Sequence, residues 1–175
     1  MITGEKVVLK GIMRDHVSEI YRWVNMEELR PLTGTVYPVS EYEHENWIER
    51  QTTSPDRKLF VVCDKENQKP LGTIGLKNID WINRNVELFI SLPELLKDKS
   101  IRGGGYGTDA VSILVKYCFH SLNMHKVYLH VFETNTRAIR CYEKAGLKTE
   151  GVLIEHHFNN GVFENVLVMG ITSSP

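Results

Sequence analysis

The sequence predicts a mixed α/β fold with a mostly antiparallel sheet and helices on both of its faces. Two observations lead to this prediction. Strand-like segments separated by turn residues follow one another in the middle of the chain, which is typical of an antiparallel meander. Further on, helical and strand-like segments alternate, which is typical of parallel pairing. The expected order of elements is β-α-α-β-β-β-α-β-α-β-β.

In the first part of the chain, residues 7–9 are expected to form the opening strand. Asp15 can cap a first helix, since apolar residues recur after it with helical spacing. Ser40 and Glu43 form a capping box, which predicts the start of a second helix. The intervening residues 30–39 contain two prolines and a glycine, so we expect a loop there.

Alternating apolar residues and turn signals define the elements of the second part. A glycine run opens one helix, and Asn135 can cap another that ends at Gly146. Asn160-Gly161 lies between two strand-like runs, which is a strong hairpin signal. The strands are expected at residues 59–63, 71–79, 85–92, 125–132, 152–158 and 163–171, with a long loop at residues 93–100.

The composition is that of an ordinary globular protein and excludes several classes. The chain has 175 residues, of which 42% are hydrophobic and 25% charged, and its net charge is −1. We therefore expect a single domain spanning residues 1–175, without the basic surface of a nucleic-acid binder and without a membrane span. Three cysteines without CxxC spacing indicate reduced thiols in a cytoplasmic protein, and clustered metal ligands are not visible, so no metal is expected.

The run Arg102-Gly103-Gly104-Gly105-Tyr106-Gly107 is the strongest local signal for function. Glycines leave backbone N–H groups unobstructed, and a helix start adds unpaired donors and the positive end of its dipole. This combination suits a pyrophosphate, although glycines also serve plain flexible turns. No Lys-Ser/Thr pair follows, as a Walker loop requires, and the position after a meander does not fit a Rossmann fingerprint.

Three ordered motifs resemble the GNAT superfamily of N-acetyltransferases. Arg102-x-x-Gly105-x-Gly107 is similar to its (Q/R)xxGx(G/A) motif, and Val86-Glu87-Leu88 to the strand that precedes this motif. The segment from Asn135 through Ala138 and Tyr142 to Leu147 is similar to NxxAxxxYxKxGF. The resemblance covers residues 71–171. At the carboxyl end, Glu150-Gly151 and the Asn160-Gly161 hairpin resemble the branch that contains ribosomal-protein and spermidine acetyltransferases. Val86, Leu147 and the long loop before Arg102 depart from the family pattern.

The resemblance implies that acetyl-CoA is the co-substrate. It also implies that backbone N–H groups near Ile90 and Ser91 bind the thioester carbonyl and the pantetheine arm. Asn135 is a helix cap, a cofactor contact or both. The expected cofactor-binding residues are Ile90, Ser91, Arg102, Gly103, Gly104, Gly105, Gly107, Thr108, Asn135 and Lys144.

Acetyl transfer to an amine needs a group that removes the ammonium proton and a group that protonates the leaving thiolate. Glu87 is the candidate for the first role, directly or through water, unless it is an exposed strand carboxylate paired with a lysine. The resemblance makes Tyr142 the general acid, and the alternative is a packing role on its helix. Direct transfer needs no covalent enzyme intermediate, so Cys141 is expected to pack, and His130 to lie in the core or an interface.

The resemblance places the acceptor groove between the first two helices, their loop and the final hairpin. Glu27, Glu28, Tyr37 and His157 are the candidate substrate contacts, although the two glutamates also suit a solvated helix end. A small amine such as a polyamine is favoured, and a protein N-terminus or an amino sugar or aminoglycoside stays open. A non-catalytic acyl-CoA-binding module and a nucleotide-binding protein are the competing classes. A homodimer is expected from the resemblance alone.

Overall fold

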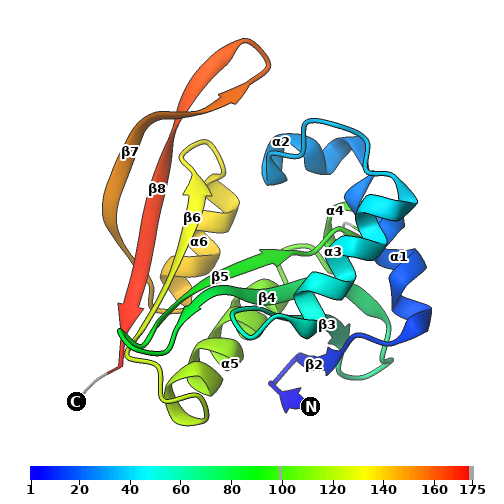
Figure 1. Cartoon of the computed structure of the whole chain (residues 1–175), viewed down its shortest axis with the longest axis horizontal. Coiled ribbons are helices and arrows are strands. Elements are labelled where there is room, and N and C mark those ends of the chain that lie inside the picture. Colours follow the sequence, from blue (N-terminus) through cyan, green and yellow to red (C-terminus); the bar gives the residue numbers. More distant parts are fainter. Residues whose placement is uncertain (99, 174–175) are drawn as a thin grey trace.

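The computed structural model describes residues 1–98 and 100–173. One eight-stranded sheet of order β1-β2-β3-β4-β5-β6-β8-β7 forms its centre (Figure 1). The strands are β1 (Ile2–Thr3), β2 (Val7–Gly11), β3 (Lys58–Asp64), β4 (Pro70–Asp80), β5 (Asn85–Ser91), β6 (Lys126–Phe132), β7 (Lys148–Asn159) and β8 (Val162–Thr172). The helices are α1 (Arg14–Val24), the 3-10 helix η1 (Glu27–Leu29), α2 (Arg30–Thr33), α3 (Glu41–Thr53), α4 (Glu94–Lys97), α5 (Tyr106–His120) and α6 (Thr136–Lys144).

The predicted fold class is confirmed, because every neighbouring pair of strands is antiparallel except β5 and β6. Helices cover both faces of the sheet, as the alternation of side chains along β3 requires. Val61 and Cys63 pack with Ile20 and Trp23 of α1, whereas Val62 belongs to the larger core that includes residues of α5. The longest described helix, α5, has 15 residues, and none of the described helices can cross a membrane.

The helix starts follow their capping residues, with one correction. The Ser40 Oγ accepts the Glu43 N–H at 3.3 Å and the Glu43 carboxylate accepts the Ser40 N–H at 2.8 Å, which confirms the predicted capping box. Asp15 does not cap α1. That helix begins at Arg14, and the His16 Nδ1 accepts the Met13 N–H at 3.1 Å, so Asp15 lies within the first turn.

Two predicted loops contain short helical segments, and β1 is an additional strand. Pro31 stands in the first turn of α2, where its fixed φ favours a helix, and Gly34 ends that helix with a φ of 73°. Leu29 of η1 and Leu95 of α4 are buried, so packing holds these short segments in place. Segments of three or four residues are too short to show a periodic pattern in the sequence.

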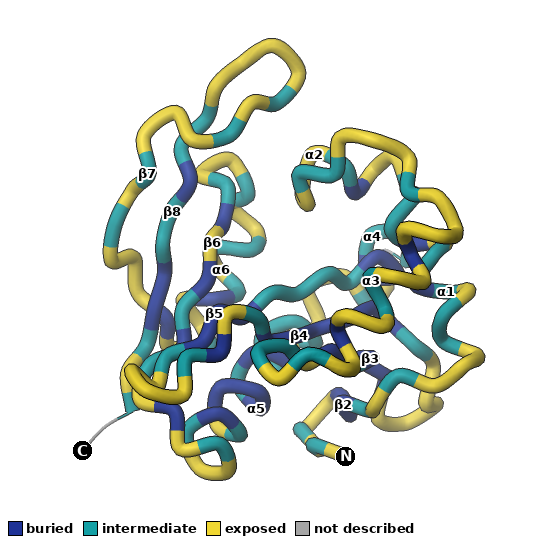
Figure 2. Tube along the Cα trace, viewed as in Figure 1, coloured by how far each residue is buried: buried dark blue, intermediate teal, exposed yellow. Residues whose placement is uncertain are grey.

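The chain ends in a long hairpin, β7–β8, which projects from the body of the domain in Figure 1. Asn160 and Gly161 form its turn, as predicted, and both have positive φ (48° and 87°). Two successive residues with positive φ give the turn whose twist matches the flanking strands. Figure 2 shows that the tip of this hairpin is largely exposed, while the core lies where the helices pack on the sheet.

The parallel pair β5 and β6 positions the site. Only Asn85 to Glu87 of β5 pair with Lys126 to Tyr128 of β6. Beyond this point β5 continues to pair with β4, and β6 continues to pair with β8. The two parallel strands therefore separate toward their carboxyl ends and leave an opening in the middle of the sheet.

Candidate active site

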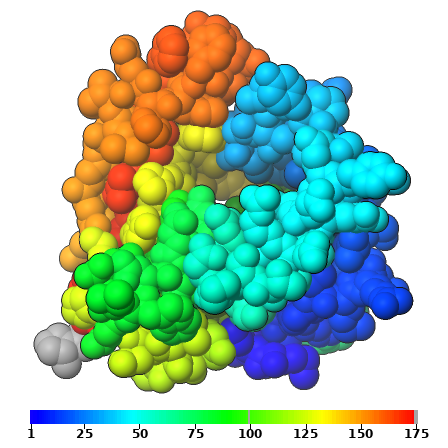
Figure 3. All heavy atoms as spheres, in the orientation of Figure 1, coloured from blue at the N-terminus to red at the C-terminus, as the bar shows by residue number. Residues whose placement is uncertain are grey.

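A cleft of about 1480 Å³ lies where β5 and β6 separate. Its walls are the second half of β5, the glycine loop with the start of α5, the end of β6, and α6. Residues of η1, α2 and α3 close the opposite side. Figure 3 shows the surface hollowed between these N-terminal helices and the segments of β6 and the hairpin.

The glycine loop meets the cleft at the N-terminus of α5. Gly103 and Gly105 both have a φ of 85°, a conformation that favours glycine, and Gly105 is the residue that precedes the helix. Gly103, Gly105, Gly107 and Thr108 line the cleft, so the first-turn N–H groups and the positive end of the helix dipole lie beside it. Gly104 does not line the cleft.

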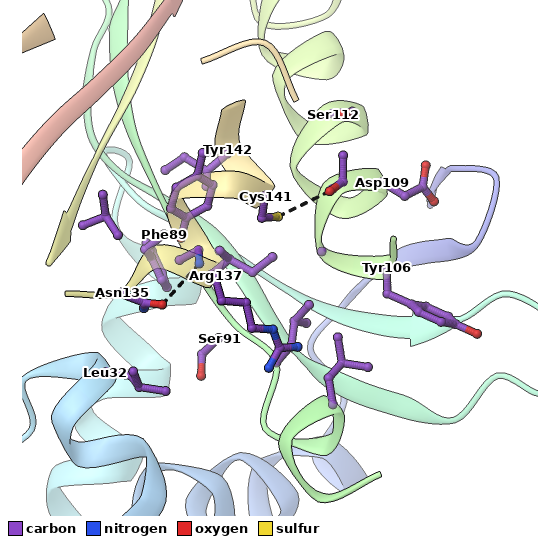
Figure 4. A pocket seen from close by; sticks show the side chains of 18 of the residues that line it. Leu32, Phe89, Ser91, Tyr106, Asp109, Ser112, Asn135, Arg137, Cys141 and Tyr142 are labelled. Atoms are coloured by element: carbon purple, nitrogen blue, oxygen red, sulfur yellow. Dashed lines mark hydrogen bonds between the residues drawn. The ribbon is translucent and has the colours of Figure 1, made fainter. Parts of the chain in front are cut away.

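Several cations line the cleft or lie beside it. Arg137 points into it (Figure 4), and its pKa is lowered by burial and by the neighbouring positive charge of Arg102. Arg102 itself is outside the lining, whereas Lys144 is part of it, as are Lys6, Lys116 and Arg140. The sequence analysis missed Arg137, although it lies inside the Asn135–Ala138 motif. It also missed Lys6, because nothing local in the sequence places the N-terminal segment beside the glycine loop.

One face of α6 forms the wall next to the start of α5, with Asn135, Cys141 and Tyr142 directed toward the cleft (Figure 4). The Asn135 Oδ1 accepts the Ala138 N–H at 3.2 Å, so Asn135 caps α6 as the sequence predicts. Tyr142 is 8% exposed, and burial raises the pKa of its phenol well above the usual range. It therefore stays protonated at neutral pH.

Cys141 lies next to the glycine loop. Its Sγ is 3.6 Å from the Oγ1 of Thr108, from which it accepts a hydrogen bond. Burial raises the pKa of the Cys141 thiol, more than the nearby cations lower it. The side chain is therefore a neutral thiol at neutral pH, which is a poor nucleophile.

On the other wall, Ile90 and Ser91 of β5 line the cleft together with Phe89 and Glu87. Glu87 is buried at the point where β5 and β6 begin to separate. Its Oε1 accepts one hydrogen bond from the His130 Nδ1 at 2.8 Å and lies 3.1 Å from the Lys77 Nζ. Its Oε2 accepts one from the Asn78 Nδ2 at 2.8 Å. Burial acts to raise the pKa of Glu87, but His130 and Lys77 outweigh it, and the net pKa is lowered.

A smaller cavity of about 460 Å³ adjoins the cleft and shares its residues Lys77, Glu87, His130 and Phe132. His157 of β7 lines this cavity and stacks on Phe132, with ring centroids 4.0 Å apart and an interplanar angle of 13°. His130 was expected in the core or an interface. It is not in the core, because 38% of its side chain is exposed, and it lines both cavities.

The remaining acceptor candidates lie away from the cavities. Glu27 and Glu28 are exposed on η1 and Tyr37 is exposed on the loop after α2, and none of the three lines either cavity. The adjacent Leu29 is buried and lines the cleft, so η1 turns its apolar residue inward and its carboxylates outward. Within residues 1–98 and 100–173, no group of three or more His, Cys, Asp or Glu side chains could hold a metal ion.

The cleft opens between two separating parallel strands and the start of a helix, and the cations that line it suit an anionic ligand. A family model for the GNAT acetyltransferase domain matches residues 6–148. The chain belongs to the GNAT family of acetyltransferases, which use acetyl-CoA as the acyl donor.

Individual relatives agree with this assignment. The chain is 35% identical over 118 residues to spermidine N(1)-acetyltransferase of Vibrio cholerae, covering 67% of this chain and 64% of that protein. It is 32% identical over 116 residues to the Escherichia coli K12 enzyme of the same name, covering 66% of this chain and 58% of that protein. These alignments thus span less than two thirds of the relatives' own length. The crystal structure of Vibrio cholerae spermidine N-acetyltransferase in complex with CoA and spermine has a TM-score of 0.84, 27% identity and 95% coverage of both chains.

Proposed function

We propose that this protein transfers the acetyl group of acetyl-CoA to a primary amine by direct attack, without a covalent enzyme intermediate. The observation that carries the proposal is the convergence of the glycine loop at the start of α5 and Tyr142 of α6 on one cleft. An anion site at a helix start and a buried hydroxyl donor are what a CoA thioester requires at its two ends.

In this proposal the pyrophosphate of CoA binds at the N-terminus of α5, and the pantetheine arm follows β5. The N–H groups of Gly105, Gly107 and Thr108 serve the pyrophosphate, with Arg137 and Lys144 as cations nearby. Among residues 1–98 and 100–173, no strand pairs with the side of β5 that faces β6 beyond Glu87. This supports backbone contacts from Ile90 and Ser91 to the pantetheine and the thioester carbonyl. Asn135 is proposed as an additional cofactor contact at the start of α6.

Attack requires a neutral amine, and deprotonating an alkylammonium at pH 7 costs about 4–5 kcal/mol, given its pKa of about 10.4. Glu87 is the carboxylate on this side of the cleft. Three donors already occupy its oxygens and its pKa is lowered, so it acts through a partner rather than by taking the proton itself. Tyr142 is proposed to protonate the departing thiolate, since its buried phenol carries its proton at neutral pH.

Direct attack is favoured over an acyl-enzyme because the one thiol in the cleft is a poor nucleophile. Cys141 is half-buried, its pKa is raised by burial, and it accepts a hydrogen bond from Thr108. A nucleophilic cysteine instead needs a lowered pKa and an adjacent base.

The acceptor is proposed to be a polyamine, with support from the relatives named as spermidine acetyltransferases. His157 and Phe132 are proposed to form an aromatic wall against which the alkyl chain of the acceptor packs. Glu27, Glu28 and Tyr37 face solvent and contribute at most to the approach of a cationic acceptor.

Two measurements test the proposal. Titration calorimetry with acetyl-CoA is expected to show 1:1 binding, and thiol release is expected with spermidine or spermine at a higher kcat/KM than with aminoglycosides, amino-sugar nucleotides or short peptides. A higher kcat/KM with one of the other amines would show that this amine, and not a polyamine, is the preferred acceptor. Tight CoA binding without thiol release from any amine would instead support a non-catalytic acyl-CoA-binding module.

A homodimer is also proposed, on the strength of the family and of the exposed apolar side chains on the final hairpin. Ile154, Val162 and Phe163 are 72%, 66% and 60% exposed. The exposed rings of Phe158 and Phe163 also pack against each other, with centroids 5.0 Å apart, and clustered apolar side chains at a surface are typical of interaction sites. Light scattering coupled to size-exclusion chromatography is expected to give twice the mass of the chain, and the mass of one chain would contradict the proposal.

A further inference from the structure

The carboxylate of Glu87 already has three donors within the protein. Asn78 and Lys77 of β4 and His130 of β6 direct donors at it from two different strands, with the distances given above. Only 7% of the Glu87 side chain is exposed. An amine in the cleft would have to displace one of these donors to reach Glu87, and a buried carboxylate that loses a charged partner is costly.

His130 is the member of this cluster that carries an imidazole, and it lines the cleft. It is exposed in the cleft, although it lies in the middle of the sheet, because β6 has separated from β5 at this position. Tyr128, His130 and Phe132 share one face of β6, while Val127, Leu129 and Val131 are buried on the other. The imidazole therefore reaches the cleft from a rigid strand rather than from a loop.

The hydrogen bond to Glu87 fixes which ring nitrogen is free. An ionised carboxylate only accepts hydrogen bonds, so the Nδ1 of His130 carries the hydrogen that lies in this bond. In the neutral imidazole the Nε2 then has a lone pair. Among the described residues, no partner for this Nε2 is found. It is thus an available proton acceptor at the edge of the cleft.

We propose that the Nε2 of His130 takes the proton from the ammonium group of the acceptor, and that Glu87 is the positioning residue that holds the ring. The inference rests on the proposed function and names the partner through which Glu87 acts. The ammonium N–H bond breaks and its proton moves to Nε2, which leaves the nitrogen lone pair free to attack the thioester carbonyl. When the tetrahedral adduct collapses, the C–S bond breaks, Tyr142 gives its proton to the sulfur, and the second nitrogen proton returns the phenol to its neutral form.

Two neighbouring charges act in opposite directions on the stability of the imidazolium formed in this step. The carboxylate of Glu87 stabilises the imidazolium. The positive charge of Lys77 of β4, which contacts the same carboxylate, destabilises it. Tyr128 packs edge-on against the ring, with centroids 6.0 Å apart. On the side of the hairpin, His156 and His157 of β7 line the smaller cavity, and Glu164 of β8 lies 3.8 Å from the His157 Nε2. His130 lines this second cavity as well as the cleft, so its ring borders both spaces.

The pH profile separates a base from a structural residue. Imidazole is the side chain that ordinarily changes charge between about pH 5 and 8. We expect kcat/KM of the wild-type protein, measured with spermidine, to fall toward acid pH, because the proposed base must have a free lone pair to accept the proton. His130→Gln is expected to lose about 100-fold or more in kcat at pH 7, to keep its affinity for acetyl-CoA, and to gain activity only as the pH approaches the pKa of the amine itself. His120→Gln, an exposed histidine at the end of α5, is the matched control.

Two further measurements distinguish loss of the base from a structural effect of the His130 substitution. Added imidazole is expected to restore part of the activity of His130→Ala, but none of the activity lost in Tyr142→Phe. Nitrogen-15 spectra of the wild-type protein are expected to show the His130 ring with its hydrogen on Nδ1, and Glu87→Gln is expected to weaken this preference.

A wild-type pH profile in His130→Gln would overturn the inference, as would a ring with its hydrogen on Nε2. If the wild-type protein released no thiol with any amine, the proposed function would fail instead, and the inference with it. Thiol release by the wild type, together with wild-type activity in His130→Gln, would contradict the role of His130 as the base. The proposed function would then still stand.

Discussion

The carboxylate of Asp109, in the first turn of α5, binds the backbone N–H of Lys6 at 2.8 Å. The same carboxylate also accepts the N–H groups of Glu5 and Val7, at 3.2 and 3.0 Å. One side chain thus joins the segment between β1 and β2 to the helix that begins at the glycine loop. It brings Lys6 to the cleft, where the Lys6 Nζ lies 5.8 Å from the centre of the Tyr106 ring.

Replacing Asp109 tests this connection. Asp109→Ala leaves three N–H groups without their acceptor and removes a negative charge from the helix N-terminus, so we expect the free energy of unfolding to fall by about 1–3 kcal/mol. Affinity for acetyl-CoA is expected to fall as well, because Lys6 and the loop lose their support. Urea denaturation and calorimetry measure the two effects. Asp15→Ala, in the exposed first turn of α1, is the control, and an equal loss in both variants would contradict the connection.

Removing the hydroxyl of Tyr142 tests its proposed role as the acid. Tyr142→Phe keeps the ring that packs in the core, so the fold and the binding of acetyl-CoA are expected to persist. We expect kcat to fall by about 100-fold or more, since the thiolate must then leave without a proton donor. Steady-state kinetics with spermidine give this value, and Tyr117→Phe on α5, whose ring is outside the cleft lining, is the comparison. A kcat equal to that of the wild type would remove Tyr142 from the mechanism.

The lowered pKa of Glu87 makes stability depend on pH in a defined direction. Because the pKa of the folded state lies below the ordinary value of 4.5, the unfolded protein binds more protons as the pH falls through this range. The stabilisation from Glu87 is therefore fully present above about pH 5 and is lost on acidification through the folded-state pKa. Glu87→Gln is expected to be less stable at pH 7 and to lose less stability between about pH 5 and 3. Parallel curves of unfolding free energy against pH would show that the Glu87 contacts contribute nothing to this dependence.

The conformation of the glycine loop predicts the effect of a single methyl group. Gly105 has a φ of 85°, where a Cβ is strained by about 1–2 kcal/mol. Gly105→Ala is expected to lose stability by about this amount and to bind acetyl-CoA more weakly, because the loop shifts the N–H groups that face the cleft. Gly11→Ala, at a position with open space and without positive φ, serves as control in thermal unfolding and calorimetry. Unchanged affinity for acetyl-CoA in Gly105→Ala would place the pyrophosphate elsewhere.

Much of the fold was predictable because its long elements carry their own signals. Ser40 with Glu43, Asn135, and Asn160-Gly161 each specify a cap or a turn within a few residues, and the structure has all three. The helices η1, α2 and α4 were not predictable. Tertiary packing of residues such as Leu29 and Leu95 stabilises them, and this packing leaves no periodic pattern in the sequence.

The candidate site likewise has residues that the sequence could predict and contacts that it could not. Gly105 and Tyr142 lie in local motifs, so the sequence identifies them as candidates, and the cleft brings both together. The contact between Glu87 and His130 depends on the register of two parallel strands, in which Glu87 is opposite Tyr128. Residues 43 positions apart in the chain meet there, and no short-range pattern encodes that meeting.

The position of β8 between β6 and β7 has a consequence for synthesis. β6 is complete at Phe132, but its antiparallel partner begins only at Val162, and β7 also pairs with β8. Until β8 follows β6 out of the ribosome, β6 has an unpaired edge, and the wall that carries His130 has no support on that side. The nascent chain therefore completes this wall of the cleft only when β8 has emerged from the exit tunnel, long after the glycine loop has been made.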